Sequence, residues 1–268
     1  MTEADAVDAV DEPVTVDRIA SDLRDLGVSP GDTLLVHSAL RAVGWVAGGA
    51  QAVVDALRES VTADGTLVMP TFTSQYTDPA GWVDPPVPDH WVETIPEAMP
   101  PYRPAVTPTR GMGAVPECFR TYPDVLRSDH PTVSFAAWGE NAATIVDSHP
   151  LDEPLGEDSP LARLYERDAE VLFLGTDHET NTSLHLAEYR ADLDAGRTRT
   201  RATVRRDGEP VVVEFEDQEL STEDFTAVGS AFEDAVGLAR GPVGAADARL
   251  ASQRAMVDFA VDWFEENR

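Results

Sequence analysis

The sequence predicts an α/β fold built in layers around a mixed sheet, with an antiparallel hairpin appended. Two short apolar runs, Thr33–Val36 and Val171–Leu174, are typical of buried strands, and amphipathic helical patterns separate them. Farther along, Asp207-Gly208 joins two strand-like runs, which is a strong signal for a type I′ hairpin. The 268 residues contain no repeat and no low-complexity linker, so we expect one domain over residues 14–268.

The N-terminal part is predicted to be a loose end followed by a helix and a strand. Residues 1–13 are acidic and small, so we expect them to be flexible. Apolar residues recur at helical spacing over Thr15–Leu26, and Gly27 is a typical C-terminal cap. The strand at Thr33–Val36 then leads directly to the polar dipeptide at residues 37–38.

A glycine-rich loop at Gly44–Gly49 follows Arg41 and opens onto a helical pattern at Gln51–Leu57. Backbone amides at a helix N-terminus favour an anion, so this loop is a candidate for binding phosphate or pyrophosphate. The loop matches neither a Walker sequence nor the dinucleotide-binding fingerprint. Taken alone, the pattern favours a plain tight turn, with anion binding as the alternative.

The chain changes character after the next predicted strand, which follows a turn at Asp64-Gly65 and ends near Phe72. Residues 74–108 are rich in Pro, Asp and aromatic residues. A long irregular segment inside a compact chain is usually a lid or a binding loop. The alternative is a surface excursion without a role in the site.

The remaining elements alternate between helices and strands. The patterns predict a short helix at 111–120, a strand at 134–139, helices at 141–147, 160–165 and 222–236, a chain break at 241–244, and a terminal amphipathic helix at 248–264. Cys118 lies among apolar neighbours and is expected to be a packed thiol. As the single cysteine it excludes an internal disulfide.

The charge is strongly negative. The net charge is −29, from 49 acidic against 20 basic residues, and every basic residue is Arg. Such a surface repels phosphates and anionic lipids, so we expect neither nucleic acid nor a membrane as a partner. Two explanations are open: adaptation to concentrated salt, which the even spread of charges favours, and an acidic docking surface. In both cases the field attracts a small cationic substrate.

The N-terminal residues are acidic and do not resemble a signal peptide. No apolar run approaches the roughly 20 residues that span a bilayer. We therefore expect a soluble, cytoplasmic protein, either a monomer or a homodimer.

The stretch Val171–Tyr189 carries the strongest chemical signal. A buried strand ends at Gly175, and Asn181-Thr182 can cap a helix on which His185 and Glu188 are three residues apart. A base and a carboxylate therefore project from one helix face, just beyond the carboxyl end of a strand. Without further information such a pair is more often a surface pair. The histidines lack ligand spacing, so we expect no metal.

Five segments, taken together and in order, resemble the aminoglycoside 3-N-acetyltransferase family. They are Leu35–Arg41, Gly44–Gly49, Gly65–Phe72, Arg127–Pro131 with Ser134–Gly139, and Asn181–Glu188. The resemblance implies a three-layer α/β/α fold, distinct from the GNAT acetyltransferases, whose pyrophosphate loop is absent here. It also implies that acetyl-CoA is the cosubstrate and that an amine accepts the acetyl group.

The resemblance also implies roles for individual residues. His185 resembles the family's catalytic histidine and Glu188 the acid close behind it. The residues that would bind the cosubstrate are His37, Ser38, Arg41, Gly44, Trp45, Val46, Gly48, Gly49, Thr71, Phe72 and Thr182. Residues 74–108 correspond to the variable region over the acceptor pocket, and the acceptor side would include Trp82, Asp177 and His130.

Some of these residues have alternative interpretations. His130 could equally fill a turn. Arg41 and Arg127 could contact CoA phosphates, although structural ion pairs are the simpler interpretation. At residues 37–40 the sequence reads His-Ser-Ala-Leu, where family members often carry a second hydroxyl, so that role falls on Ser38 alone. His178 is not expected to be the base, and His90 and His149 are expected on the surface.

The predicted reaction is transfer of an acetyl group to the 3-amino group of an aminoglycoside. His185 would act as general base and Glu188 would orient it, while Ser38, Thr182 or backbone amides would stabilise the oxyanion. The alternatives are N-acetylation of a different cationic amine and a non-catalytic relative that binds CoA or an amine.

Overall fold

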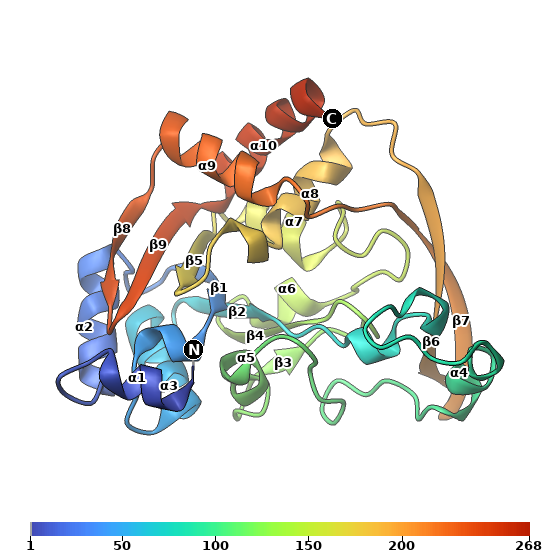
Figure 1. Ribbon diagram of the computed structural model, residues 1–268, viewed down its shortest axis with the longest axis horizontal. Coiled ribbons are helices and arrows are strands. Elements are labelled where there is room, and N and C mark those ends of the chain that lie inside the picture. The colour runs from blue at the N-terminus through green and yellow to red at the C-terminus, as the bar shows by residue number, and fades with distance from the viewer. Residues whose placement is uncertain (1) are drawn as a thin grey trace.

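The computed structural model describes residues 2–268, and a mixed sheet of seven strands forms its centre (Figure 1). The strand order is β3-β4-β2-β1-β5-β9-β8. Their bounds are β1 Thr33–Ser38, β2 Thr66–Pro70, β3 Leu126–Arg127, β4 Phe135–Gly139, β5 Glu170–Leu174, β8 Ala239–Val243 and β9 Ala246–Ser252. The predicted mixed sheet is confirmed.

The central strand β1 pairs in parallel with both β2 and β5, whereas the outer pairs are antiparallel. Leu35 lies opposite Val68 on one side and Val171 on the other. All three are completely buried, as expected for strands covered on both faces. The parallel arrangement brings the carboxyl ends of β1, β2 and β5 to the same edge of the sheet.

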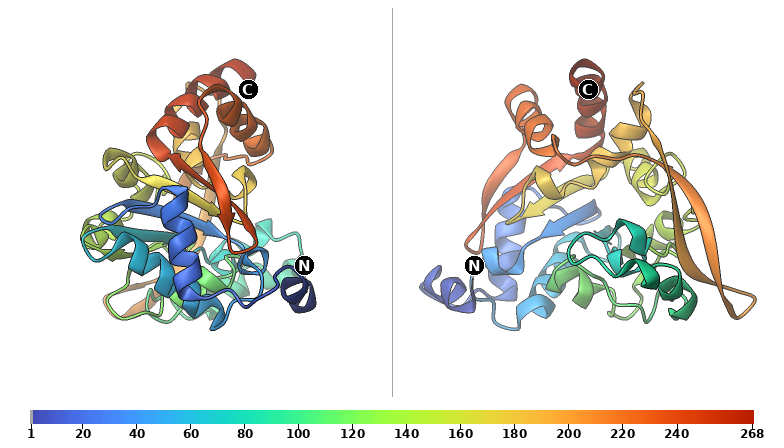
Figure 2. Two further views of the ribbon diagram at one scale, coloured as in Figure 1. Left: turned by 90° about the vertical axis from the view of Figure 1, so that its left-hand side faces the viewer. Right: turned by 45° about the vertical axis from the view of Figure 1, so that its right-hand side comes forward.

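Helices cover both faces of the sheet (Figures 1 and 2). One apolar core lies between the sheet and α2, α3 and α5, and a second lies between the sheet and α6 to α10. The three layers are therefore confirmed. The helix bounds are α1 Glu3–Asp8, α2 Val16–Leu26, α3 Gly49–Val61, α4 Thr94–Ala98, α5 Ala114–Phe119, α6 Ala142–Val146, α7 Pro160–Glu166, α8 Ser183–Arg190, α9 Phe225–Ala235 and α10 Gln253–Asn267.

The hairpin of β6 (Arg197–Arg206) and β7 (Glu209–Gln218) is separate from the main sheet and arches along one side of the molecule (Figure 1). Asp207 and Gly208 have φ angles of 51° and 90°, and a type I′ turn requires positive φ at both positions. The predicted hairpin is confirmed.

The segment 74–108 packs against this hairpin. It contains the short 3₁₀ helices η2 (Ser74–Tyr76), η3 (Pro79–Gly81) and η4 (Asp89–Trp91) in addition to α4. Tyr102 donates its backbone N–H to the carbonyl of Thr203 over 2.9 Å. The Arg201 guanidinium pairs with Glu93 at 2.8 Å. The hairpin therefore holds the Pro-rich segment in place by contacts between residues about one hundred positions apart.

The two ends of the chain differ from the prediction. Residues 1–13 were assigned no structure from the sequence, but Glu3–Asp8 form α1, with a capping box between Thr2 and Asp5. At the other end, the predicted break and the predicted helix start at Ala248 are wrong, because β8 and β9 form a hairpin there. The alanine-rich run of β9 has a helical composition, but pairing with β5 overrides this local preference. Helix α10 begins after Ser252, whose hydroxyl caps it.

Candidate functional site

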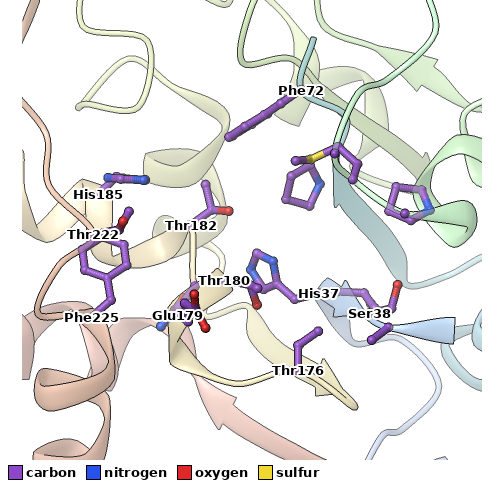
Figure 3. A pocket seen from close by; sticks show the side chains of 18 residues that line it. His37, Ser38, Phe72, Thr176, Glu179, Thr180, Thr182, His185, Thr222 and Phe225 are labelled. Carbon is purple, nitrogen blue, oxygen red and sulfur yellow. The ribbon is translucent and has the colours of Figure 1, made fainter. Parts of the chain in front are cut away.

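A cavity of about 420 Å³ opens where the carboxyl ends of the parallel strands meet (Figure 3). Open α/β sheets commonly bind ligands at this edge. Its lining comes from β1, from the segments that follow β2 and β5, and from α5, α8 and α9. The lining residues are Val36, His37, Ser38, Ala39, Pro70, Phe72, Gly111, Met112, Gly113, Pro116, Thr176, Glu179, Thr180, Asn181, Thr182, His185, Thr222 and Phe225.

His185 and Glu188 of α8 are in direct contact, as the sequence predicts. The Nδ1 of His185 and the Oε2 of Glu188 are 2.6 Å apart, and the Glu188 side chain is only 1% exposed. The other carboxylate oxygen accepts the Ser221 N–H at 2.9 Å and an Arg268 N–H at 2.6 Å. Three donors therefore converge on one carboxylate and fix its position. With Nδ1 donating to Glu188, the Nε2 of the neutral ring is left as an acceptor.

The turn between β5 and α8 explains how His185 reaches the cavity. Gly175 has a φ of 69°, and an added Cβ would lie 2.3 Å from the Cβ of Ala42, so only glycine fits. The carbonyl of the Asn181 side chain accepts the Ser183 N–H at 3.2 Å. Asn181 therefore supplies the side-chain cap that the sequence offered, whereas the Thr182 side chain caps nothing. Thr182 instead lines the cavity.

His37 and Ser38, at the end of β1, line the cavity across from His185 (Figure 3). The His37 ring is 7% exposed and stacks on Phe173 with centroids 5.6 Å apart. Neither the Nε2 of His37 nor the Oγ of Ser38 has a hydrogen-bond partner among residues 2–268, although both atoms are buried. Burial, with a smaller effect of His178, lowers the pKa of His37 to about 3. The ring is therefore neutral at physiological pH.

The glycine-rich loop lines a different cavity, of about 230 Å³. Arg41, Gly44, Trp45, Val46 and Gly49 form its wall together with Leu40 and with Glu3 and Ala6 of α1. The predicted cosubstrate residues are thus divided: His37, Ser38, Phe72 and Thr182 line the first cavity and the loop residues line the second. Gly48 lines neither of the two.

Thr71 and Arg127 have structural contacts. Thr71 is completely buried, and its hydroxyl is 3.1 Å from the Nε of Arg127. The Arg127 guanidinium donates to the carbonyls of Thr71 and Thr107 at 2.6 Å and of Pro104 at 3.1 Å. The expected ion pair at Arg127 is therefore wrong, because this cation binds neutral carbonyls.

The three residues predicted on the acceptor side do not line the main cavity. Trp82 donates its Nε1–H to the Thr77 hydroxyl at 2.9 Å. Asp177 is exposed at the rim, where its side chain accepts the Glu179 N–H. His130 is completely buried, and its Nδ1 accepts the Val133 N–H at 3.0 Å, so it fills a turn.

His149 is buried, which contradicts the predicted surface position. Its ring lies 4.8 Å from that of His130, and its Nε2 bonds the Pro154 carbonyl at 2.7 Å. Burial is the main cause that lowers the pKa of His149 to about 4 and that of His130 to about 3. His90 is exposed, as predicted.

Several cavity residues were missed by the sequence analysis. Phe225 packs on His185 with centroids 5.0 Å apart, and Thr222 precedes it in the wall. Asp217 does not line the cavity, but it was also missed: it accepts a hydrogen bond from the Tyr189 hydroxyl and lies near His185, and burial raises the pKa of its carboxyl. The Gly-Met-Gly sequence at residues 111–113 is a signal that could have indicated this part of the cavity wall, since Gly111 and Gly113 both have positive φ.

Residues 2–268 contain neither a metal-binding cluster nor a helix that could span a membrane. No group of three or more His, Cys, Asp or Glu side chains in this range could hold a metal ion. None of the helices described here is long and apolar enough to cross a membrane.

A family model described as aminoglycoside 3-N-acetyltransferase matches residues 35–265. This chain belongs to the aminoglycoside 3-N-acetyltransferase family. The family resemblance found in the five sequence segments is therefore confirmed, and it extends over most of the chain.

Known members of the aminoglycoside 3-N-acetyltransferase family match almost the whole chain. The aminoglycoside N(3')-acetyltransferase-like protein YokD of Bacillus subtilis is 45% identical over 97% of this chain and 96% of its own length. Its crystal structure has a TM-score of 0.96, with 98% of each chain covered. Aminoglycoside N(3)-acetyltransferase VII of Streptomyces paromomycinus is 39% identical over 96% of this chain and 93% of its own. The structure of AAC-IIIb with CoASH has 31% identity and a TM-score of 0.85 over 95% of this chain and 97% of its own.

Proposed function

We propose that this member of the family transfers the acetyl group of acetyl-CoA to an amino group of an aminoglycoside, at the 3-N position of the 2-deoxystreptamine ring. The observation that carries the proposal is the His185–Glu188 pair, 2.6 Å apart, in a cavity at the carboxyl edge of the sheet. The names of the relatives and the bound CoASH in AAC-IIIb support the reaction class and the cosubstrate.

His185 acts as the general base in this proposal. An acceptor ammonium must lose a proton before its nitrogen can attack a thioester, and an imidazole is suited to proton transfer near neutral pH. Glu188 holds the Nδ1–H, so the Nε2 lone pair is available, and it stabilises the imidazolium that forms. Arg268 and the Ser221 N–H keep the carboxylate in position.

Acetyl-CoA is a substrate in this proposal, and each cavity has features that suit one part of it. The unpartnered Nε2 of His37 and Oγ of Ser38 call for a polar group in the main cavity, as a thioester and its pantetheine arm provide. The glycine-rich loop leads into α3, whose N-terminus has no side-chain cap and suits a phosphate. We therefore assign the reactive end of acetyl-CoA to the main cavity and its phosphates to the loop.

The acceptor side is assigned from charge. Glu179 lines the main cavity, the exposed Asp177 is two residues before it in the chain, and Asp217 lies near His185, so the surroundings of the cavity are acidic and favour a cationic amine. His130 and Trp82 are engaged in structural contacts, and we assign neither of them a contact with the acceptor. We propose that residues 74–108 cover the acceptor end.

The composition supports two further proposals. A net charge of −29 with Arg as the only basic residue type favours a protein that works in concentrated salt. A cytoplasmic location fits the proposed use of acetyl-CoA. Monomer and homodimer are both compatible with the family fold.

The function can be tested by following CoA release from acetyl-CoA with a thiol reagent that tolerates high salt. We would use gentamicin and neomycin as acceptors and putrescine as a simple diamine, in dilute and in multimolar potassium chloride. Release that depends on an aminoglycoside, with the acetyl group located on the 3-amino nitrogen by NMR, is the expected result. CoA release with putrescine but not with an aminoglycoside would show that the acceptor is a different kind of amine. Binding of acetyl-CoA without release of CoA would contradict the enzymatic function.

A further inference from the structure

Three polar atoms of the cavity wall are buried without a hydrogen-bond partner among residues 2–268: the Nε2 of His37, the Oγ of Ser38 and the Oγ1 of Thr176. The His37 side chain is 93% removed from solvent, and its Nε2 has no partner within residues 2–268. Leaving a buried polar atom without a partner is unfavourable, because the atom loses its bonds to water on folding. Such an atom in a cavity wall is suited to bond a ligand (Figure 3).

The surroundings of His37 make it a hydrogen-bond donor and not a second base. Its ring stacks on Phe173, at an interplanar angle of 16°, and no carboxylate among the described residues is bonded to it. His178 packs against Phe173 as well, with centroids 5.0 Å apart, and it pairs with Glu233 at 3.1 Å. An apolar ring and a neighbouring imidazole both disfavour an imidazolium at His37. A neutral imidazole still offers one N–H.

We propose that His37 is a catalytic residue whose Nε2–H donates to the carbonyl oxygen of the thioester and stabilises the oxyanion formed there. The inference rests on the proposed function, since it assigns the acyl group of acetyl-CoA to this wall. His37 and His185 both line the cavity and belong to different elements, β1 and α8. This leaves the space between them for the carbonyl carbon and the attacking nitrogen.

The two histidines have different roles in the reaction. The amine nitrogen, whose ammonium proton His185 has taken and passed to solvent, forms a bond to the carbonyl carbon. The π electron pair of the C=O bond moves to oxygen, where the His37 Nε2–H holds it. His185 takes one N–H proton from the attached nitrogen. The electron pair on oxygen then re-forms the C=O bond, and the C–S bond breaks with its electron pair leaving on sulfur. His185 returns the proton to the thiolate, so the products are the N-acetyl amine and CoA-SH.

The experiment compares His37→Phe, which removes the donor, with His37→Gln, which keeps an N–H at a similar reach. The matched control is His149→Gln, the same change at a buried histidine outside this cavity. We expect His37→Phe to lower kcat by about 10²- to 10³-fold, while His37→Gln stays within about tenfold of wild type. The Kd for CoA, which lacks the acetyl carbonyl, should change little in all three variants. Unchanged kcat in His37→Phe, or a loss confined to CoA affinity, would overturn the inference.

A second measurement needs no acceptor and separates this inference from the proposed function. The infrared C=O stretch of acetyl-CoA labelled with ¹³C at the carbonyl is recorded on the protein. We expect a shift to lower wavenumber in wild type and His37→Gln that is lost in His37→Phe, because a donor weakens the C=O bond. The same stretch in His37→Phe and wild type would exclude His37 as the donor, whichever amine the protein accepts. If no tested amine is acetylated but the C=O shift is retained, only the proposed acceptor is contradicted.

Discussion

Two histidines line one cavity and each packs against a phenyl ring, but only His185 is also bonded to a carboxylate. His185 touches a buried carboxylate, which itself is fixed by Arg268 and a backbone N–H. His37 lies on a phenyl ring, and its Nε2 has no partner in the part of the chain that the structure describes. A carboxylate stabilises the imidazolium, whereas an apolar ring destabilises it. The same side chain is thereby suited to moving a proton in one place and to donating a hydrogen bond in the other.

The largest effect is expected from removing the base. His185→Ala should lower kcat by about 10²- to 10⁴-fold, the usual contribution of general acid–base catalysis. Binding of CoA should be retained, because the cavity wall around His37 is unaltered. Steady-state kinetics and calorimetric titration with CoA measure the two quantities. The control is His90→Ala, at an exposed histidine of η4, and a His185→Ala enzyme as active as this control would refute the comparison.

Removing only the charge beside the base should have a smaller effect. We expect Glu188→Gln to lower kcat by about 10²-fold, since the amide can still hold the ring but stabilises the imidazolium less. The matched control is Asp224→Asn, which removes a different carboxylate from Arg268 and does not touch His185. A variant that keeps its turnover rate but binds CoA more weakly would show that Glu188 has no role in orienting the base.

The buried pair His130 and His149 extends the comparison to histidines with a structural role. Their folded-state pKa values, about 3 and about 4, lie below the unfolded value near 6.5. Below pH 6.5 the unfolded chain therefore binds more protons than the folded chain. The free energy of unfolding is highest above pH 6.5 and decreases as the pH falls towards 4. Lowering the pH from 7.5 to 5 should reduce the free energy of unfolding by roughly 2 kcal/mol for each of the two histidines.

Urea denaturation at the two pH values tests this expectation. His149→Gln should lose about 2 kcal/mol less than wild type between pH 7.5 and pH 5, because one titrating group is gone. His90→Gln, at the exposed histidine, should lose as much as wild type. Equal losses in all three proteins would mean that His149 does not contribute to acid sensitivity.

The smallest effect is expected at the second cavity, whose loop residues do not contact the reacting groups in our proposal. Trp45 is 39% exposed and lines this cavity. Trp45→Ala should raise the KM for acetyl-CoA about three- to tenfold, the equivalent of losing one aromatic contact, with kcat unchanged. Trp91→Ala, at a tryptophan of η4 that is 51% exposed, is the control. If kcat falls instead, the division between the two cavities is wrong.

Local patterns predicted the parts of this molecule that depend on near neighbours. The contact between His185 and Glu188 follows from a spacing of three residues on a helix, and the hairpin turn follows from Asp207-Gly208. The same holds for β1 and β5, whose apolar runs read as buried strands without any knowledge of their partners.

The missed features depend on distant partners. Strand β9 has an alanine-rich sequence and becomes a strand only because β5 lies beside it. The sequence left His130 open between a role in the site and a turn, and it favoured an ion pair for Arg127, whereas the fold surrounds both side chains with backbone carbonyls and amides. The unsatisfied Nε2 of His37 is likewise a property of the assembled cavity, so the sequence could name His37 but could not indicate its chemical role.

The way in which Arg127 is held has a consequence for how the protein responds to its solvent. Its guanidinium joins the backbone at Thr71, next to Phe72 of the cavity wall, to the backbone at Thr107, and its partners are carbonyl dipoles. Mobile ions weaken pairs of exposed opposite charges, such as Arg199 with Glu216, far more than short bonds in a largely buried site. Raising the ionic strength should therefore loosen the outer surface first, while the wall of the cavity keeps its shape.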